Sequence, residues 1–266
     1  MPELPELEVA RKTLLPCAKG RTIGEVVVGR EKAIRTPLED GRAFAINLNR
    51  HRVTAIERRG KALVFRLDGD MAMVFHFKLG ALAVCRGERV TETGGVAWNF
   101  TDGTAIEFTD LQLSEFHLGH MDELARLPVL KGGADPLDPS LSAERLRRLL
   151  PPGKQLKSAL TDQDILAGIG NTYSDEILWQ SRLSPFRKSS SLSGDEFTEL
   201  ARQMKATLKD AISKGGEKEF RDANERHGRY QNQVHRRAGE PCPRDGHTIE
   251  MVKRGRKTFY CPHCQV

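Results

Sequence analysis

The sequence predicts an α+β protein with two domains, a β-rich one followed by a helical one that ends in a metal-bound hairpin. Three observations support this fold class. Short runs that alternate apolar and polar residues recur between residues 22 and 110. Helical periodicity replaces them after about residue 122. Three of the five cysteines crowd the end of the 266-residue chain, at Cys242, Cys261 and Cys264.

The N-terminal half predicts one helix and then many strands. Residues 6–16 form a short amphipathic pattern that should end at Pro16. Turn signals such as "DGD" and "DG" separate the strands that follow. Many short strands joined by turns are typical of a sandwich or a barrel. The β-rich segments are residues 22–29, 51–67, 71–85 and 94–110.

The C-terminal half predicts helices around a glycine turn. Residues 131–140 are rich in Gly, Pro and Asp and indicate a linker. A helical pattern covers 141–150, and a longer one begins at Ser193, where Glu196 completes a capping box. Between them, "GIGN" at 168–171 predicts a tight turn, and the helix after it would present N–H groups to an anion.

Composition favours a partner made of nucleic acid. The chain has 42 Lys and Arg against 36 Asp and Glu, and cations gather between residues 221 and 257. Such a cluster suits a phosphate backbone, although a solvated basic face would give the same pattern. No apolar run has the length of a membrane span, and no signal peptide is recognisable. We therefore expect an intracellular, cytoplasmic protein.

The cysteines predict a metal site. An odd number of cysteines without a signal peptide argues against a disulfide framework, so we expect reduced thiols, including the isolated Cys17 and Cys85. Cys261 and Cys264 form a C-x-x-C knuckle, and Cys242 supplies a third thiolate for a structural Zn²⁺.

The fourth zinc ligand is less clearly indicated. His247 is favoured, because it has an acceptable spacing from Cys242 and structural sites often combine Cys with His. Asp245 occupies the position at which a second C-x-x-C pair would be complete, and it is the alternative. Thiols without a metal are the third possibility.

Four motifs stand out along the chain: "MPELPELE", "RRGKALVF", "AGIGNTYSDEIL" and "RKTFYCPHCQ". Together they resemble the formamidopyrimidine-DNA glycosylase / endonuclease VIII family. The first is similar to the N-terminus of its formamidopyrimidine branch, the second to its lysine-bearing strand, the third to its helix–two-turn–helix element and the fourth to the end of its zinc finger. The resemblance implies a two-layer β-sandwich with flanking helices over residues 1–130, a linker and first helix over 131–149, a helix–two-turn–helix domain over 150–234 and a zinc-finger hairpin over 235–266.

The resemblance also implies an activity, that of a base-excision-repair DNA glycosylase and AP lyase. Such an enzyme flips oxidised bases out of duplex DNA, here formamidopyrimidines and 8-oxoguanine, and cleaves the strand by β,δ-elimination. Pro2 would be the nucleophile after removal of Met1, because an α-amino group titrates near pH ~8 and is partly neutral at physiological pH. Glu3 would transfer protons. Glu6 would have a supporting role in catalysis beside Pro2 and Glu3, or would simply favour the start of a helix.

The same resemblance implies DNA contacts. Lys61 would belong to the catalytic residues and contact a phosphate and the damaged nucleotide, whereas His76 would contact a phosphate. Asn171 and Arg256 would bind phosphates that flank the lesion; such contacts fix register without reading sequence. Leu79 in "HFKLGA" would fill the space that the flipped base leaves. We expect damaged double-stranded DNA as the partner, a monomer, and association with the nucleoid.

One stretch departs from the family. Where the branch has "DPRRFG", this chain has "DLQLSEFHLG", and no arginine follows Asp110. Gln112 and Phe116 are candidate replacements. The base preferred opposite the lesion is therefore open, as is the lesion-covering loop within residues 217–233. Two alternatives follow: the same chemistry directed at oxidised pyrimidines or other lesions, and a non-catalytic zinc protein that binds damaged DNA.

Overall fold

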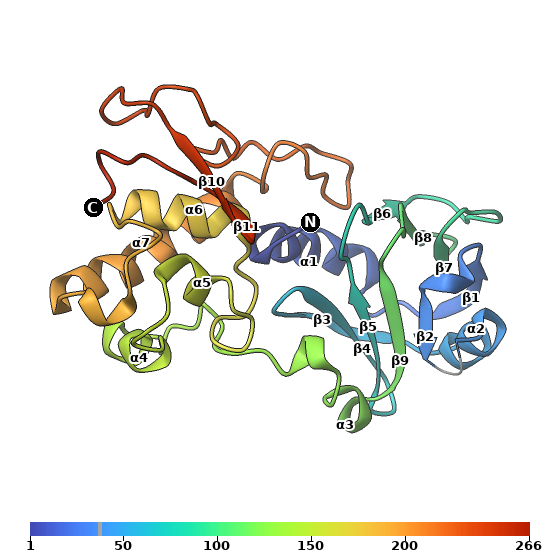
Figure 1. Ribbon diagram of the computed structural model, residues 1–266. Helices are drawn as coiled ribbons and strands as arrows, with labels where there is room; N and C mark the ends of the chain where they lie inside the picture. The colour runs from blue at the N-terminus through green and yellow to red at the C-terminus, as the bar shows by residue number, and fades with distance from the viewer. Residues whose placement is uncertain (37–38) are drawn as a thin grey trace. The chain divides into compact units, whose positions relative to one another are not determined.

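The computed structural model describes residues 1–36 and 39–266, and it divides the chain into two compact units (Figure 1). Unit 1 contains Met1–Lys131 and Lys218–Gly228, and unit 2 contains Gly132–Glu217 and Arg229–Val266. The predicted two-domain α+β class is confirmed. Among the described residues, no helix has the length and apolar character needed to span a bilayer.

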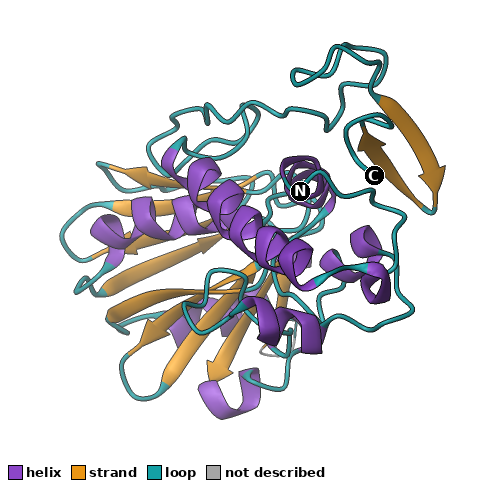
Figure 2. Cartoon of the chain, turned by 90° about the vertical axis from the view of Figure 1, so that its left-hand side faces the viewer, coloured by secondary structure: helices purple, strands orange, loops and turns teal. Residues whose placement is uncertain are grey.

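Unit 1 is built around two sheets, which Figures 1 and 2 show as groups of strands with helix α1 beside them. The four-stranded sheet has the order β1-β7-β8-β6 and the five-stranded sheet the order β2-β9-β5-β4-β3. The strands are β1 (Ile23–Val28), β2 (Ile34–Thr36), β3 (Val53–Arg59), β4 (Ala62–Leu67), β5 (Met71–His76), β6 (Leu82–Arg86), β7 (Val96–Phe100), β8 (Ala105–Thr109) and β9 (Glu115–His120).

The core of unit 1 is an aromatic cluster between these sheets. Phe75 of β5 stacks on Phe116 of β9 with ring centroids 4.5 Å apart, and its edge meets Phe108 of β8 at 5.0 Å. Trp98 meets Phe65 at 5.1 Å, and all five rings are fully buried. Each buried ring contributes roughly 1.5–3 kcal/mol relative to exposure to water. This packed core therefore holds the strand ends in fixed positions, and with them the ends of the loops that connect the strands.

The helices of unit 1 differ from the prediction at one boundary. Helix α1 runs from Leu4 to Ala18, so Pro16 lies inside its last turn and does not end it. The sequence patterns also missed α2 (Gly41–Leu48), which begins at an Asp40 cap, and strand β9. The remaining short elements of this unit are η1 (Glu31–Ala33), α3 (Met121–Leu124) and η2 (Pro128–Leu130).

Unit 2 packs its helices around α6 (Asn171–Gln180), in which every residue from Thr172 to Trp179 is buried. Helix α7 (Gly194–Ser213) starts with the predicted capping box, in which the Glu196 amide donates to Ser193 Oγ at 3.2 Å. Figure 2 shows β10 and β11 as a separate pair of strands. The other elements are α4 (Ala143–Leu149), α5 (Leu156–Leu160), η3 (Ser189–Ser191), β10 (Glu250–Arg254) and β11 (Arg256–Tyr260).

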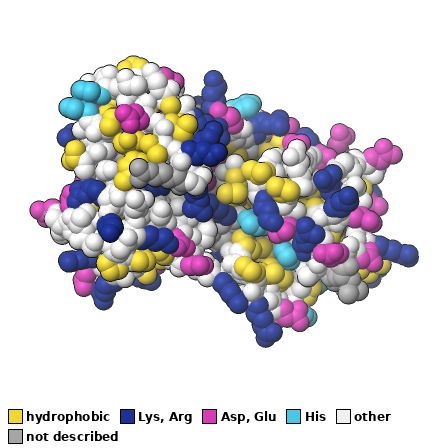
Figure 3. Space-filling view, viewed as in Figure 1, with side chains coloured by type: hydrophobic (Ala, Val, Ile, Leu, Met, Phe, Trp, Pro, Cys, Tyr) yellow, Lys and Arg dark blue, Asp and Glu magenta, His cyan; other side chains and the backbone are white. Residues whose placement is uncertain are grey.

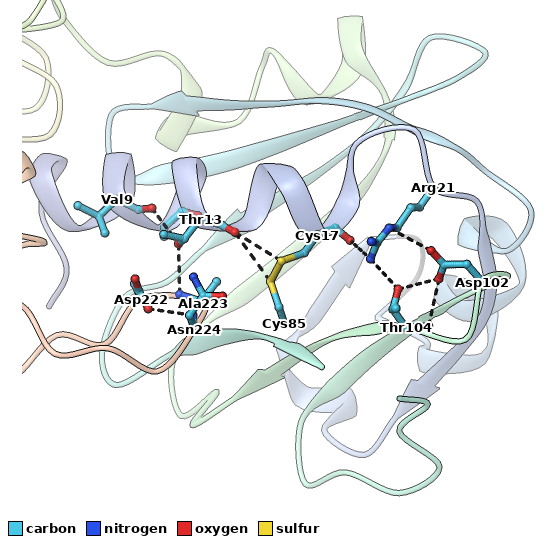
Figure 4. Close-up of a disulfide and its surroundings, with 11 residues drawn as sticks. Val9, Thr13, Cys17, Arg21, Cys85, Asp102, Thr104, Asp222, Ala223 and Asn224 are labelled. Atoms are coloured by element: carbon cyan, nitrogen blue, oxygen red, sulfur yellow. Dashed lines mark hydrogen bonds and ion pairs between the residues drawn. A yellow bond between two sulfur atoms is a disulfide. The ribbon is translucent and has the colours of Figure 1, made fainter. Parts of the chain in front are cut away.

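A disulfide contradicts the expectation that all five cysteines are reduced thiols. Cys17 near the end of α1 is bonded to Cys85 of β6, with their Cα atoms 6.1 Å apart (Figure 4). The two residues are 68 positions apart in the sequence. The sequence did not predict this bond, because the two cysteines are brought together only by the packing of α1 against β6.

Residues 218–228, the part of the C-terminal half that belongs to unit 1, pack beside this disulfide (Figure 4). The Ala223 amide donates to Thr13 Oγ1 at 3.2 Å, and the Cys85 amide donates to the Ala223 carbonyl at 2.8 Å. Glu225 pairs with Arg86 at 3.1 Å. Much of the stretch in which we expected a lesion-covering loop is thus tied to α1 and β6.

Candidate active site

The first residues of the chain are held in place by the start of α1. Pro2 is half-buried, whereas Glu3 and Glu6 are only 4% and 2% exposed. Glu3 and Glu6 form a reciprocal capping box, in which the Glu3 amide donates to Glu6 Oε2 at 3.0 Å. An acid here also lies at the positive end of the helix dipole. The capping box therefore fixes Glu3, the residue after Pro2, at the start of α1.

Helix α1 is in turn fastened to the five-stranded sheet by an ion pair between Glu8 and Arg58 of β3. Glu8 contacts Arg58 of β3 at 3.4 Å and Arg11 at 2.6 Å, and the Arg58 side chain is only 7% exposed. Burial alone would raise the pKa of Glu8, but the hydrogen bond from Arg11 and the charges of Arg11 and Arg58 hold it below its usual value. The carboxylate therefore stays ionised and keeps the helix on the sheet.

Lys61 and His76 lie near each other in unit 1. Lys61 follows Gly60, whose φ of 53° permits the tight turn between β3 and β4. The next residue, Ala62, pairs with His76 in the antiparallel register. Burial, together with the charges of Lys78 and Lys61, lowers the pKa of His76 to about 4. His76 is therefore neutral at pH 7 and stands beside two cations, an arrangement suited to a phosphate group.

Two exposed leucines stand on adjacent loops of unit 1. Leu79, in the β5–β6 loop, is 48% exposed, and Leu113, in the β8–β9 loop, is 55% exposed. The loops are joined by Ser114, whose Oγ donates to the Phe77 carbonyl at 2.6 Å, and by an ion pair between Lys78 and Glu115 at 2.6 Å. Leu79 has the exposure that a wedge requires, and sequence reasoning missed Leu113.

The other candidate replacements in the β8–β9 loop have different environments. Gln112 is exposed, so it can meet a base. Phe116 is fully buried in the aromatic core, so its interpretation as part of the wedge is wrong. Alternation in "LQLS" would have placed Leu113 on the same face as the buried Leu111, so no sequence signal marked its exposure; Leu111 and Ser114 are buried on either side of the exposed Gln112 and Leu113.

In unit 2, a glutamine holds the glycine turn that precedes α6. Gly168 has a φ of 102°, which L side chains rarely adopt. Gln163 Oε1 accepts from the Gly168 amide at 2.9 Å, while its Nε2 donates to the carbonyls of Ile169 and Thr161 at 2.8 and 2.9 Å. Asn171 begins α6 and is exposed. The turn is thereby fixed with Asn171 at the open end of the helix.

Arg256 belongs to the same scaffold. It is exposed on the β10–β11 hairpin, and its Nη1 donates to Thr161 Oγ1 at 2.5 Å. Since Thr161 is bonded to Gln163, one network connects the glycine turn with the hairpin. Arg256 is thus linked through Thr161 and Gln163 to the glycine turn that precedes Asn171.

The acids of "TYSDE" are structural anchors of unit 2. Asp175 pairs with Lys157 at 2.6 Å and with His235 at 2.8 Å, and it accepts from the Phe259 amide of β11 at 3.3 Å. Glu176 accepts from three successive backbone amides, at 2.7 to 3.0 Å. Burial raises the pKa of Glu176, and the three amides oppose that shift. Both residues fasten the C-terminal segment to α6.

The thiols gather into a cluster that fits a structural zinc ion. Ligand atoms of Cys242, Asp245, Cys261 and Cys264 all lie within 4.8 Å of one another. Cys242 Sγ is 3.8 Å from Cys264 Sγ, and Cys261 Sγ is 3.6 Å from the Asp245 oxygens. Sulfurs at about 2.3 Å from a tetrahedral ion would be ~3.8 Å apart, and sulfur and oxygen ~3.5 Å apart. The donor set matches those values.

The predicted fourth ligand, His247, is not in this group, and the alternative, Asp245, takes that place. The Asp245 side chain is 17% exposed and faces Cys261, whereas the His247 side chain is 53% exposed. The C-x4-H spacing of Cys242 and His247 would allow both residues to bind one ion, but spacing does not fix the direction in which the His247 imidazole points. Burial raises the pKa of the Cys264 thiol to about 12, and a bound cation would favour its thiolate.

Lys and Arg side chains are present on both units and are interspersed with acidic ones on the face that Figure 3 shows. The predicted cation Lys61, with His76 and Leu79, belongs to unit 1. Asn171, Arg256 and the zinc cluster belong to unit 2. Each unit therefore carries part of the predicted DNA-contacting set.

Three family models match the chain in order. They are the formamidopyrimidine-DNA glycosylase N-terminal domain over residues 1–114, the H2TH domain of the same glycosylase over 133–221, and a zinc finger found in FPG and IleRS over 239–266.

Similar proteins agree over the whole length. The formamidopyrimidine-DNA glycosylase of Geobacillus kaustophilus is 38% identical and that of Lactobacillus johnsonii 34% identical, each covering 100% of this chain and at least 99% of the relative. Among solved structures, the MutM (Fpg) protein of Thermus thermophilus superposes with a TM-score of 0.84 at 32% identity, covering 99% and 98% of the two chains. The Lactococcus lactis Fpg bound to DNA containing an abasic site has a TM-score of 0.87 at 27% identity, covering 99% of each.

Proposed function

The chain belongs to the formamidopyrimidine-DNA glycosylase family, and from that premise we propose how its own residues carry out base-excision repair. It is a DNA glycosylase that acts on oxidised bases, with the strand-cleaving lyase activity of the family. Formamidopyrimidines and 8-oxoguanine are the proposed substrates. The observation that carries the assignment is Pro2 placed directly before a buried carboxylate, Glu3, at a fixed helix start.

Pro2 acts as the nucleophile once Met1 has been removed. The freed nitrogen is a secondary amine, and its lone pair forms a bond to the sugar C1′ while the bond from C1′ to the damaged base breaks. Opening of the sugar ring then gives an iminium between the proline nitrogen and C1′. The iminium acidifies the neighbouring sugar protons, and their loss drives β- and then δ-elimination of the phosphates.

Glu3 moves the protons in this sequence. Its carboxyl group delivers a proton to the sugar ring oxygen as the ring opens, and its place next to Pro2 keeps it within reach of the same sugar. Glu6 is a positioning residue, since its carboxylate accepts the Glu3 amide and thereby sets the start of α1. This role of Glu6 is the structural alternative that the sequence left open.

The DNA backbone is bound by two groups of residues. In unit 1, Lys61 supplies charge and the neutral His76 supplies a hydrogen bond to a phosphate. In unit 2, Asn171 and Arg256 bind phosphates from a common scaffold through Thr161 and Gln163. The zinc ion, held by Cys242, Asp245, Cys261 and Cys264, keeps the Arg256 hairpin folded.

Leu79 and Leu113 fill the space left by the flipped nucleotide. Their exposure and the bonds between their two loops support a shared wedge, in place of the arginine and phenylalanine of the family pattern. Gln112, between Leu111 and Leu113, faces the orphaned base and offers both a donor and an acceptor. The Gln112 amide both donates and accepts hydrogen bonds, whereas the arginine of the family's "DPRRFG" motif only donates them. We therefore expect this protein to prefer a different base opposite the lesion from that preferred by relatives with the arginine.

Borohydride trapping on duplexes that contain 8-oxoguanine tests the proposal. The Met-processed protein should form a covalent adduct with the DNA, and Pro2→Gly, which removes the secondary amine, should lose most of it. Equal trapping by both proteins would exclude the proline mechanism. An incision panel with 8-oxoguanine and thymine-glycol duplexes, each against all four opposite bases, then tests the substrate range; preference for thymine glycol would indicate an enzyme for oxidised pyrimidines.

A single chain carries every residue assigned above, which supports action as a monomer on DNA of the nucleoid. Light scattering coupled to size-exclusion chromatography, with and without damaged duplex, tests the oligomeric state. A dimer that persists at low concentration would contradict this part of the proposal.

A further inference from the structure

Two side-chain N–H groups of unit 2 are directed at sulfurs of the zinc cluster. Trp179 Nε1 donates to Cys242 Sγ at 3.3 Å, and Arg244 Nη1 donates to Cys264 Sγ at 3.4 Å. Trp179 and Cys242 are only 6% and 2% exposed, so little water competes for the first of these bonds. Neither donor belongs to the ligand set, but each contacts an atom that would bind the metal.

The two donors also contact each other. The guanidinium carbon of Arg244 lies 4.0 Å from the centroid of the Trp179 ring, and Arg244 Nη1 donates to the Trp179 carbonyl at 2.9 Å. A cation over an indole ring is a favourable contact. Trp179 lies in the last turn of α6, where the negative end of the helix dipole also favours a cation. Arg244 therefore connects α6 with the zinc cluster, and Trp179 contacts the cluster from the helix itself.

Charge explains why these contacts matter at this cluster. Three thiolates and one carboxylate carry more negative charge than Zn²⁺ neutralises. Part of the excess lies on buried atoms, since Cys242 and Cys261 are 2% and 0% exposed. A buried charge is costly unless hydrogen bonds or opposite charges compensate it. Arg244 supplies a positive charge and a hydrogen bond, and Trp179 supplies a second hydrogen bond.

We propose that Trp179 and Arg244 are positioning residues, which fasten the zinc-bound finger to α6 through the sulfurs of Cys242 and Cys264. Metal binding requires the thiolate form of cysteine. A thiolate accepts stronger hydrogen bonds than a thiol, because bonds to ionised groups are roughly twice as strong as neutral ones. The metal therefore strengthens the contacts with α6, and by thermodynamic linkage those contacts raise the affinity for the metal.

This contact gives the zinc ion a second role beside folding the β10–β11 hairpin. Helix α6 begins with Asn171 and carries Trp179 in its last turn, so a finger fastened to α6 keeps Arg256 in a fixed position relative to Asn171. Only this consequence rests on the proposed function, in which both residues bind phosphates. The contacts between the two donors and the sulfurs are measurable without DNA.

Metal affinity of the full-length protein tests the two donors. Trp179→Phe keeps an aromatic ring and removes the N–H, and Arg244→Gln removes the charge. Each should weaken Zn²⁺ binding about 10–100-fold in competition with a chromophoric chelator, the usual effect of losing a group that supports a metal ligand. Arg244→Lys restores the charge but not the planar group, so it should recover part of the loss. Arg202→Gln, a change of an exposed arginine of α7, should bind zinc as wild type does.

Hydrogen exchange reports whether the finger is fastened to α6. With zinc bound, Arg244→Gln should exchange faster than wild type both in the last turn of α6 and across residues 239–266. Exchange in the sheets of unit 1 should not change. Equal protection of the finger in the variant and in wild type would mean that Arg244 does not hold it.

Cobalt spectra separate hydrogen bonding to sulfur from packing. Co²⁺ replaces zinc, and its thiolate-to-cobalt absorption bands report the charge on the sulfurs. Loss of an N–H donor raises that charge, so the bands of Trp179→Phe and Arg244→Gln should move to longer wavelength, and those of Arg202→Gln should not. Wild-type affinity with unshifted bands would overturn the proposal, and so would weaker binding with unshifted bands, because packing alone would then explain the loss. Both outcomes are independent of the glycosylase activity, since no DNA is present.

Discussion

The start of the chain and the C-terminal hairpin both carry residues of the proposed site, but different forces hold the two segments. Pro2 and Glu3 precede a helix whose apolar side packs on the large core of unit 1, which includes the aromatic cluster. The hairpin has only a small cluster of buried residues: Trp179, Val234, Cys242, Ile249 and Cys261. Two of those five are zinc ligands. A metal thus replaces the core that a segment of this size cannot build.

The largest expected effect is loss of the metal site. Cys261→Ala should release the structural zinc and unfold the β10–β11 hairpin, because structural zinc contributes about 10–16 kcal/mol in isolated zinc fingers. Hydrogen exchange should show lost protection in residues 239–266 and unchanged protection in the sheets of unit 1. Leu113→Ala, a change at the surface of unit 1, should leave the zinc content as it is. If the hairpin stayed protected from hydrogen exchange without zinc, its fold would not depend on the metal.

The next effect concerns catalysis in unit 1. Glu3→Gln should lower incision of an 8-oxoguanine duplex by about 10²–10⁴-fold, the usual contribution of a general acid or base. Its melting temperature should change little, since glutamine can still accept at the helix start. Single-turnover incision assays measure this change, with the exposed Glu92→Gln as control. Activity within a few-fold of wild type would leave Glu3 with a purely structural role.

The disulfide should stabilise unit 1 and not the hairpin. Closing a loop of this length contributes about 2–4 kcal/mol by restricting the unfolded chain. Adding a phosphine reductant should therefore lower the free energy of unfolding of unit 1 by that amount in urea. Cys17→Ser/Cys85→Ser should show the lower stability with no response to reductant. Identical unfolding curves with and without reductant would mean that the bond does not form in solution.

The wedge residues should affect activity without affecting stability. Leu79→Ala/Leu113→Ala should lower incision of damaged duplex about tenfold, or ~1.4 kcal/mol, because apolar surface that contacts the DNA stack is lost. Since both side chains are exposed in the free protein, the melting temperature should stay within error of wild type. Ile46→Ala, another exposed apolar residue of unit 1, is the matched control. Equal losses in the control would argue against a specific wedge.

The smallest effect is the response of unit 1 to acid. The pKa of His76 is lowered to about 4 in the folded protein, so between pH 6.5 and 4 the unfolded chain binds a proton that the folded chain does not. Stability from this group is therefore present above pH 6.5 and is lost as pH falls. We expect a loss on the order of 1 kcal/mol between pH 7 and pH 5. Urea unfolding at both pH values should show a smaller loss for His76→Gln.

Local patterns located most of the helices and strands and singled out the candidate site residues. Turn signals and alternation located β3 to β8, and the Ser193 capping box located α7. The motif at the chain start identified Pro2 and Glu3, because a residue in a local motif needs no long-range information. Strand β9 was missed, since the departure at "DLQLSEF" concealed its alternation until the pairing of Phe116 with Phe75 became visible.

The sequence by itself determined the two-domain class, the family motifs and the thiols that gather around zinc. Only the tertiary structure decided which partner each distant residue meets. It paired Cys17 with Cys85, buried Phe116, exposed Leu113, and placed Asp245 rather than His247 with the thiols. The physical reason is that spacing along the chain limits which atoms can meet, whereas the direction of a side chain depends on the packing around it.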